Sequence, residues 1–344
     1  NHSCVIAVSA SLQCWGANAF GQLGNGTFTD STVPRRVVGP TSWVSVSAGG
    51  SATCAIDAAS MLWCWGTNEY GQVGDGTTTG RALPTLVSGA RTWSQVAVGG
   101  MHTCAITTAG QAYCWGHAES GQIGDGGASI APRLIPTLAA VAGVTFSSIY
   151  VGDAHSCALT SAGLAYCWGD NSNKQLGDLA STWQSLTPTV LPWTTPTITP
   201  TAAAMLRNTP YVSAPGLAFR ALELSGTTTC GVTTGKALYC WGSGYGQYPV
   251  RIGTGSTWLN VSVGSGHTCG VTDIGGALCW GLNDSGQLGD GWTTNLTVPV
   301  AVSGSTTWAS VAVGQRHTCG VSTGGMTWCW GSNASGQLGD GRPI

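Results

Sequence analysis

The stretch HTCAITTAGQAYCWG, residues 102–116, places two cysteines ten positions apart, on either side of a turn-like Thr-Thr-Ala-Gly. The same spacing occurs seven times in the 344-residue chain and uses all 14 cysteines. The pairs are Cys4 with Cys14, Cys54 with Cys64, Cys104 with Cys114, Cys157 with Cys167, Cys230 with Cys240, Cys269 with Cys279, and Cys319 with Cys329. Each second cysteine begins a Cys-Trp-Gly triplet, and successive triplets lie 50, 50, 53, 73, 39 and 50 residues apart. A period of this length indicates a protein built from repeats.

Each repeat carries the pattern of short β-strands. Eleven residues before the first cysteine of six pairs stands an aromatic residue, and apolar side chains follow at alternate positions, as at Val96 and Val98. The aromatic residues are Trp43, Trp93, Phe146, Phe219, Trp258 and Trp308. This alternation is typical of half-buried strands, and we find no convincing 3.6-residue period of a helix. Glycine-rich segments, clearest at 286–291 and 336–341, separate the strands.

These patterns predict an all-β chain folded as a seven-bladed β-propeller of four-stranded antiparallel blades, with one disulfide in each blade. The single propeller would span residues 1–344. A linear solenoid is the alternative, but it would need polar capping repeats at its ends, and none is visible in the sequence.

The cysteine spacing favours a clip across a hairpin. If the strands on both sides of the turn pair, the two cysteines face each other with Cα atoms roughly 4.5 Å apart, within the disulfide range. A zinc site or a redox motif usually brings Cys-x-x-Cys spacing, which is absent here. Oxidised pairs predict a secreted or extracellular location.

Six Asn-x-Ser/Thr triplets support that location as acceptors of N-linked sugar. They begin at Asn1, Asn25, Asn260, Asn283, Asn295 and Asn333. Chance is the other interpretation, because such triplets are common in a sequence rich in serine and threonine.

A Thr/Pro-rich insertion, residues 179–217, lengthens the interval between the fourth and fifth triplets to 73 residues. Prolines at every fourth position among threonines favour an extended polyproline II conformation. Two interpretations stay open: a loop at the rim of the propeller, or an arm that carries O-linked sugar or hydroxyproline and contacts a neighbour. The residues of such an arm are Thr187, Pro188, Thr189, Pro192, Thr194, Thr195, Pro196, Thr197, Thr199, Pro200 and Thr201.

The first blade is expected to be incomplete. When the last repeat is joined to the first, the segment with the Trp-x-x-Val-x-Val pattern is absent, which predicts one missing strand and an exposed sheet edge. We expect that the chain continues beyond Ile344; the alternative is that another chain donates the strand. Donation between copies would make head-to-tail contacts that can build a filament.

Composition and motifs exclude several classes of function. Lys+Arg number 12 against 14 Asp+Glu, and 8% of the residues are charged, so the chain has no basic face for nucleic acid. No apolar run has the length of a membrane-spanning helix. No catalytic triad, phosphate-binding loop or carboxylate pair stands out, and repeated residues rarely form the asymmetric site of an enzyme. We therefore expect no catalysis and no cofactor.

A column of histidines stands two residues before the first cysteine in five repeats, at His2, His102, His155, His267 and His317. A ring of imidazoles near the axis would suggest a metal site. However, Ala52 and Thr228 interrupt the column, so a hydrogen bond to the neighbouring blade is the preferred interpretation and no metal site is predicted.

The order Gly-x-x-His-Thr-Cys, Gly-x-x-x-Cys-Trp-Gly and Gly-Gln-Leu-Gly-Asp-Gly resembles the repeat of the regulator of chromosome condensation family. The resemblance covers nearly the whole chain and implies a seven-bladed propeller, here a secreted variant clipped by disulfides. Family members include a nucleotide exchange factor for a small GTPase and a plant UV-B photoreceptor that uses tryptophans in a Gly-Trp-Arg-His-Thr motif. The matching positions here are Gly50, Gly100, Asp153, Gly226, Ser265 and Gln315, so photoreception is not supported.

Together these features predict an extracellular structural or adhesive glycoprotein module, such as a filament or surface-coat subunit, without catalytic activity. The alternative is a secreted protein-binding propeller of the inhibitor type, or a lectin-like module that binds carbohydrate. The expected partners are other protein chains, including copies of itself, and covalent glycans.

Overall fold

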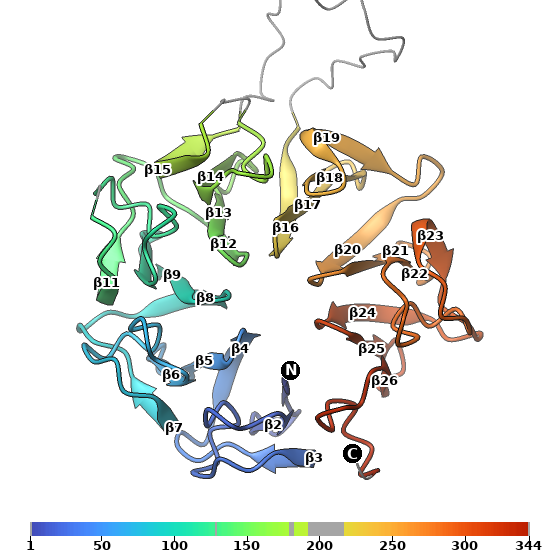
Figure 1. Ribbon diagram of the computed structural model, residues 1–344, viewed down its shortest axis with the longest axis horizontal. Coiled ribbons are helices and arrows are strands. Elements are labelled where there is room, and N and C mark those ends of the chain that lie inside the picture. Colours follow the sequence, from blue (N-terminus) through green and yellow to red (C-terminus); the bar gives the residue numbers. More distant parts are fainter. Residues whose placement is uncertain (1, 128, 179–181, 192–216, 343–344) are drawn as a thin grey trace, which may run out of the picture.

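Seven antiparallel sheets surround a central axis, and the predicted seven-bladed propeller is confirmed (Figure 1). The structure is a computed structural model that describes residues 2–127, 129–178, 182–191 and 217–342. All regular structure in these residues is β-strand. Each four-stranded blade runs from an inner strand beside the axis, through two middle strands, to an outer strand at the rim.

The strands fall into four columns. The inner strands are β4 (Trp43–Gly49), β8 (Trp93–Val98), β12 (Ser148–Val151), β16 (Phe219–Ser225), β20 (Trp258–Val263) and β24 (Trp308–Val313). The second strands are β1 (His2–Ile6), β5 (Ala52–Asp57), β9 (His102–Thr107), β13 (His155–Leu159), β17 (Thr228–Thr233), β21 (His267–Thr272) and β25 (His317–Ser322). The third strands are β2 (Leu12–Gly16), β6 (Leu62–Gly66), β10 (Ala112–Gly116), β14 (Ala165–Asp170), β18 (Leu238–Gly242), β22 (Ala277–Gly281) and β26 (Thr327–Gly331). The outer strands are β3 (Ser31–Arg36), β7 (Arg81–Leu86), β11 (Arg133–Leu138), β15 (Gln184–Val190), β19 (Gly246–Ile252) and β23 (Leu296–Ala301).

Five blades have four strands and two have three, among the described residues. The first blade, β1-β2-β3, lacks an inner strand as predicted, but the last blade, β24-β25-β26, also lacks an outer one. The prediction of a single missing strand is therefore wrong. The reason is that each repeat passes from the outer strand of one blade to the inner strand of the next, so one missing stretch removes both.

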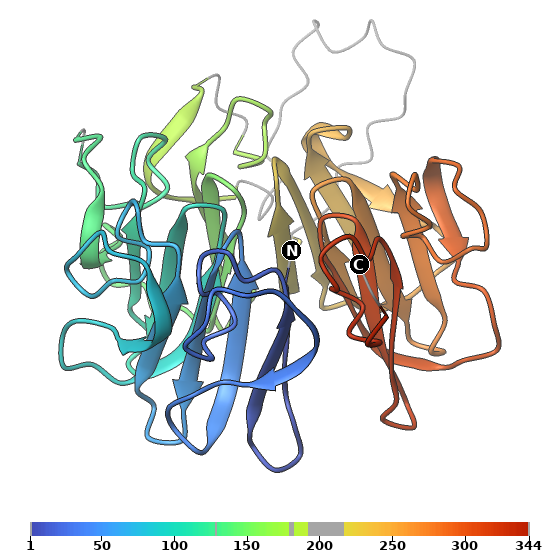
Figure 2. The same ribbon diagram turned by 60° about the horizontal axis from the view of Figure 1, so that its bottom comes forward.

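The first and last blades meet through a loop instead (Figure 2). The Trp15 indole Nε1 donates a hydrogen bond to the carbonyl oxygen of Gln337 at 3.0 Å, and the Gly341 amide donates to the Thr32 carbonyl at 3.1 Å.

All seven cysteine pairs form disulfides, as predicted. In every blade the two cysteines lie directly opposite each other on the second and third strands, as Cys104 and Cys114 do on β9 and β10. The Cα–Cα distance is 4.1 Å in each pair, and no cysteine is free. The register of the hairpin thus explains why the separation of ten never changes.

The tryptophan of the Cys-Trp-Gly triplet locks neighbouring blades together. The buried Trp115 indole donates a hydrogen bond of 2.9 Å to the carbonyl oxygen of Gln72, in the glycine-rich loop of the preceding blade. Gly74 in that loop has φ +77°, and a Cβ there would lie 2.6 Å from the Trp115 Nε1. Both the backbone conformation and the close approach therefore require glycine. This explains the recurring Gly-Gln-Leu-Gly segment.

The insertion is shorter than predicted, because Gln184–Val190 forms β15, the outer strand of its blade. Thr189 pairs with Cys167 of β14. The interpretation of Thr187, Pro188 and Thr189 as part of a polyproline II arm is therefore wrong. Proline cannot donate to a ladder, but on an outer edge strand its missing N–H faces away from the sheet. The other arm residues, from Pro192 to Thr201, lie outside the described residues.

Candidate functional site

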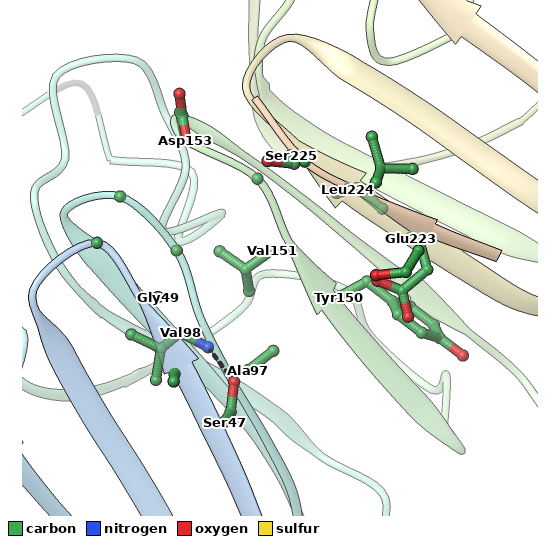
Figure 3. Close-up of a pocket in the computed structure, with 18 of the residues that line it drawn as sticks. Ser47, Gly49, Ala97, Val98, Tyr150, Val151, Asp153, Glu223, Leu224 and Ser225 are labelled. Carbon is green, nitrogen blue, oxygen red and sulfur yellow. Dashed lines mark hydrogen bonds between the residues drawn. The ribbon is translucent and has the colours of Figure 1, made fainter. Parts of the chain in front are cut away.

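A cavity of about 990 Å³ lies at the axis of the propeller and is lined by residues of all six inner strands. Figure 3 shows the part of it that is lined by β4, β8, β12 and β16. The cavity is the candidate functional site, and we call it the channel. Most of its wall is small and neutral, with Ser47, Ala97, Ser262 and Ala312 at matching places on their strands. The turns that follow the inner strands, such as Gly99-Gly100, form its mouth.

Hydrogen bonds between side chains and backbone join neighbouring inner strands of the channel wall. An inner strand has a free edge toward the axis, and its backbone groups need partners. Ser47 Oγ accepts a hydrogen bond from the Val98 amide of the next blade at 3.0 Å, and Ser262 Oγ does the same for Val313 at 3.0 Å. Gln95 Oε1 accepts one from the Ile149 amide at 2.9 Å. These bonds join β4 to β8, β8 to β12 and β20 to β24, and we call the inner strands that they hold the collar.

Two neighbouring blades depart from this neutral wall, since Tyr150 on β12 and Glu223 on β16 occupy the place of the serines and alanines (Figure 3). Glu223 is partly buried, and burial raises its pKa to about 8. Burial also raises the pKa of the Tyr150 hydroxyl. Asp153 adds a second carboxylate at the mouth, whereas no lysine or arginine is among the described residues that line the channel.

The histidine column serves the contacts between blades, as the sequence suggested. The Nε2 atoms of His2, His102, His155, His267 and His317 lie 2.7, 2.9, 3.0, 2.8 and 3.2 Å from a serine or threonine hydroxyl of the next blade. At His155 the hydroxyl is that of Thr229, which itself donates to the Gln175 carbonyl at 2.9 Å. Its proton is therefore used, so His155 must donate through Nε2–H, and Nδ1 carries no proton.

Burial lowers the pKa of every histidine in the column. The values are about 3 for His2 and His102, and about 4 for His155, His267 and His317, with desolvation as the largest cause. These imidazoles are neutral at pH 7. Among the described residues, no group of three or more histidine, cysteine or acidic side chains is placed to hold a metal ion.

The predicted sugar acceptors differ in accessibility. Asn295 is exposed and Asn25 and Asn333 are partly exposed. Asn283, in contrast, is 0% exposed, and its Nδ2 donates to Asp290 Oδ1 at 3.1 Å and to the Trp292 carbonyl at 3.0 Å. Asn260 lines the channel and its Nδ2 donates to the Ala309 carbonyl at 3.2 Å. Asn1 lies outside the described residues, and sugar attachment stays a prediction.

The repeats match the family models for the regulator of chromosome condensation (RCC1) repeat over more than half of the chain. One model matches residues 11–56, 61–106, 109–159 and 275–321, and a second matches 43–72, 93–122, 146–175, 258–287 and 308–337. The chain belongs to the RCC1 repeat family. The family match includes six of the seven Cys-Trp-Gly triplets, all but the one at residues 240–242.

Solved structures of other proteins share the fold at low sequence identity. Prp20p from Saccharomyces cerevisiae has a TM-score of 0.81 at 18% identity, over 99% of this chain and 85% of that one. Human WBSCR16 has a TM-score of 0.77 at 20% identity, over 92% of this chain and 83% of that one. The ectodomain of the Physcomitrella patens receptor kinase CR4 has a TM-score of 0.58 at 18% identity, over 96% and 70%. The sequence matches none of the curated proteins with which it was compared.

Membership of the RCC1 family does not place a site on this chain. At such identities the structural neighbours show the fold alone. No helix in the described part of the chain is long and apolar enough to cross a membrane. The channel residues Tyr150 and Glu223 escaped the sequence analysis, although both break the small-residue column of the inner strands.

Proposed function

We propose that this RCC1-family propeller is an extracellular structural or adhesive module that binds other protein chains, copies of itself included, without catalysing a reaction. The observation that carries the proposal is the disulfide in every blade. Eleven of the 14 cysteines are 0% exposed, and none is free. Disulfides form and persist in oxidising compartments and are rare in the cytosol, so this arrangement suits a secreted protein.

The structural neighbours are consistent with a binding role. One structure shows yeast Prp20 bound to Kap60, and another is of Prp20p, with its binding to Gsp1p and histones. A third neighbour is the ectodomain of a receptor kinase, so the fold also occurs outside a cell. Scarce charge fits a partner held by neutral polar and apolar contacts rather than by a polyanion.

One observation favours the second candidate, a secreted propeller that captures a protein or a carbohydrate on one face. Phe28, Trp183 and Trp292 are 62, 62 and 73% exposed. All three lie in the loop between the third and outer strands of their blades, and equivalent loops of a propeller emerge on the same face. Exposed aromatic side chains on one face are typical of a recognition surface.

Mass spectrometry of the native, non-reduced protein tests the proposal, with and without removal of N-linked sugar. We expect seven disulfides within single hairpins, together with sugar on exposed acceptors. Free thiols and an absence of sugar would instead indicate a binding propeller of a reducing compartment. Binding that is lost on replacing Trp183 and Trp292 by alanine, with unchanged self-association, would favour the second candidate.

A further inference from the structure

We propose that the channel binds an ammonium group carried on an unbranched aliphatic stem, with the Glu223 carboxylate as its counter-ion and the Tyr150 ring beside it. The two side chains come from neighbouring inner strands and line the same part of the wall (Figure 3). They are close enough for the charge of Glu223 to act on the Tyr150 hydroxyl. A carboxylate next to an aromatic ring stabilises an organic cation through its charge and through the negative face of the ring.

Glu223 is available to a ligand because the collar does not use it. Ser47 and Ser262, at the same place on their strands, are occupied by backbone amides of the next blade. For Glu223, the described residues provide no hydrogen bond and no ion pair. On the other side, β20 presents Asn260, whose amide is bonded to the Ala309 carbonyl, and Ser262. Polar groups in such a wall take up water or a ligand.

The other titratable groups of the channel also favour a cation. Asp153 adds negative charge at the mouth, and His2, His117 and His317 are the remaining titratable residues of the lining besides Tyr150 and Glu223. Desolvation keeps the pKa of His2 at about 3 and that of His317 at about 4, so these two add no positive charge at pH 7.

The nearest guanidinium on the same strand does not neutralise Glu223. Arg220 Nη2 donates to the backbone carbonyls of Trp258 and Leu259 in the next blade. The wall beyond the carboxylate is small, with Ala97 and Ala312 among its members, which leaves room for an aliphatic stem in a cavity of about 990 Å³.

Binding of the ammonium group is coupled to release of a proton. Because burial raises the pKa of Glu223 to about 8, the empty site is mostly protonated at pH 7. An ammonium ligand stabilises the ionised carboxylate, so close to one proton leaves for each ligand bound. A neutral alcohol with the same stem leaves the carboxyl protonated and releases none.

Isothermal titration of the oxidised native chain at pH 7 and low salt tests the proposal, with pentylammonium and 1-pentanol as probes. Titrations in two buffers of different ionisation enthalpy count the protons released. The variants are Glu223→Gln, which keeps the shape of the side chain, and Glu69→Gln as the matched control. Glu69 is exposed in the loop between β6 and β7 and does not line the channel.

We expect the unmodified chain to bind pentylammonium at least about tenfold more tightly than pentanol, with release of close to one proton. Glu223→Gln should lose about tenfold in ammonium affinity and all proton release, while Glu69→Gln keeps both. Tyr150→Phe should retain binding, and Tyr150→Ala should weaken it several-fold. Equal ammonium affinity for the chain and Glu223→Gln would overturn the proposal, and so would equal affinity for the alcohol. This test needs no partner protein, so its outcome is separate from that of the proposed function.

Discussion

Replacing Thr229 by valine should destabilise the propeller more than the same replacement at Thr103, and the difference measures the histidine contact between blades. Both threonines are 0% exposed, and both donate to a glutamine carbonyl at 2.9 Å. Only Thr229 also accepts a hydrogen bond, from His155 Nε2 at 3.0 Å, because the matching position before Thr103 is Ala52. Valine keeps the shape of threonine but removes its hydroxyl.

The expected magnitudes follow from these partners. The glutamine carbonyls keep a second donor in both variants, since Trp115 and Trp241 also bond them. Thr103→Val therefore loses one buried hydrogen bond, worth about 1 kcal/mol. Thr229→Val loses two and leaves the buried His155 N–H without a partner, which adds about 1–3 kcal/mol.

Equilibrium unfolding in urea at pH 7 without reductant, followed by tryptophan fluorescence, measures the two losses. A second replacement, His155→Leu, should recover part of the loss in Thr229→Val, because it removes the unpaired donor. It should give no such recovery in Thr103→Val, where the two sites are independent. Equal losses in the two threonine variants, or an absence of recovery, would refute the assignment of Nε2–H as a donor across the blades.

The remaining predictions concern pH, the glycine loops and sugar. The pKa of His155 is about 4 in the folded chain and 6.5 when unfolded, so its stabilising contribution is complete above pH 6.5 and is lost as the pH falls toward 4. Each such histidine contributes up to about 1.4 kcal/mol per pH unit in this window; thermal midpoints that stay constant from pH 6.5 to 4 would contradict this. In urea unfolding, Gly74→Ala should cost several kcal/mol of unfolding free energy, because the position has a positive φ and the new Cβ would clash with the Trp115 indole. Gly143 is the control, since it also has a positive φ but no atom within 4 Å of an added Cβ. Gly143→Ala should therefore cost only about 1 kcal/mol. Glycopeptide mapping should find sugar on Asn295 and none on Asn283, whose amide is buried and doubly bonded; occupied Asn283 in folded protein would show that the loop opens.

The hairpins were predictable because the register of their strands fixes the number of residues between the paired cysteines. Directly opposed cysteines fix a separation of ten, and a helical or metal-binding arrangement would not repeat it. The glycine loops were visible for the same reason, since Gly74 and its equivalents admit no side chain. Residues under the same geometric constraint in every blade recur at the same position of the repeat, so they can be recognised in a single sequence.

The outer strands were only partly predictable, because each contains a proline, and proline argues against a strand in the middle of a sheet. Every outer strand carries a proline at the same place: Pro34, Pro84, Pro136, Pro188, Pro249 and Pro299. A proline column signals an edge strand when it repeats, and the four-residue spacing of Pro188 with the prolines after it concealed that column.

Asn283 also recurs from blade to blade, in a column with Asn18, Asn68 and Asn171. The side-chain oxygen of each asparagine accepts a hydrogen bond from a backbone amide of the glycine-rich loop, and the asparagine is therefore buried.

The direction of Glu223 depends on a bulge near the start of its strand. With a strict period of two, Glu223 would lie on the same face as Phe219, yet the register shifts between Phe219 and Ala221 and turns Glu223 to the other face. The mark of this bulge in the sequence is the three-residue step from Phe219 to Leu222, which recurs in the Trp-x-x-Val-x-Val pattern of other inner strands. The sequence does not show that this other face lines a channel.

The features that repeat in all blades are explained by packing between blades. Tyr150 replaces serine and alanine at a wall position, but it also packs against the core between its own blade and the next. Glu223 stands at the same position and bonds no amide of the next blade, so packing between blades does not account for it. In a molecule built from near-copies, a binding function has to reside in such departures, because only they give the channel one side that differs from the others.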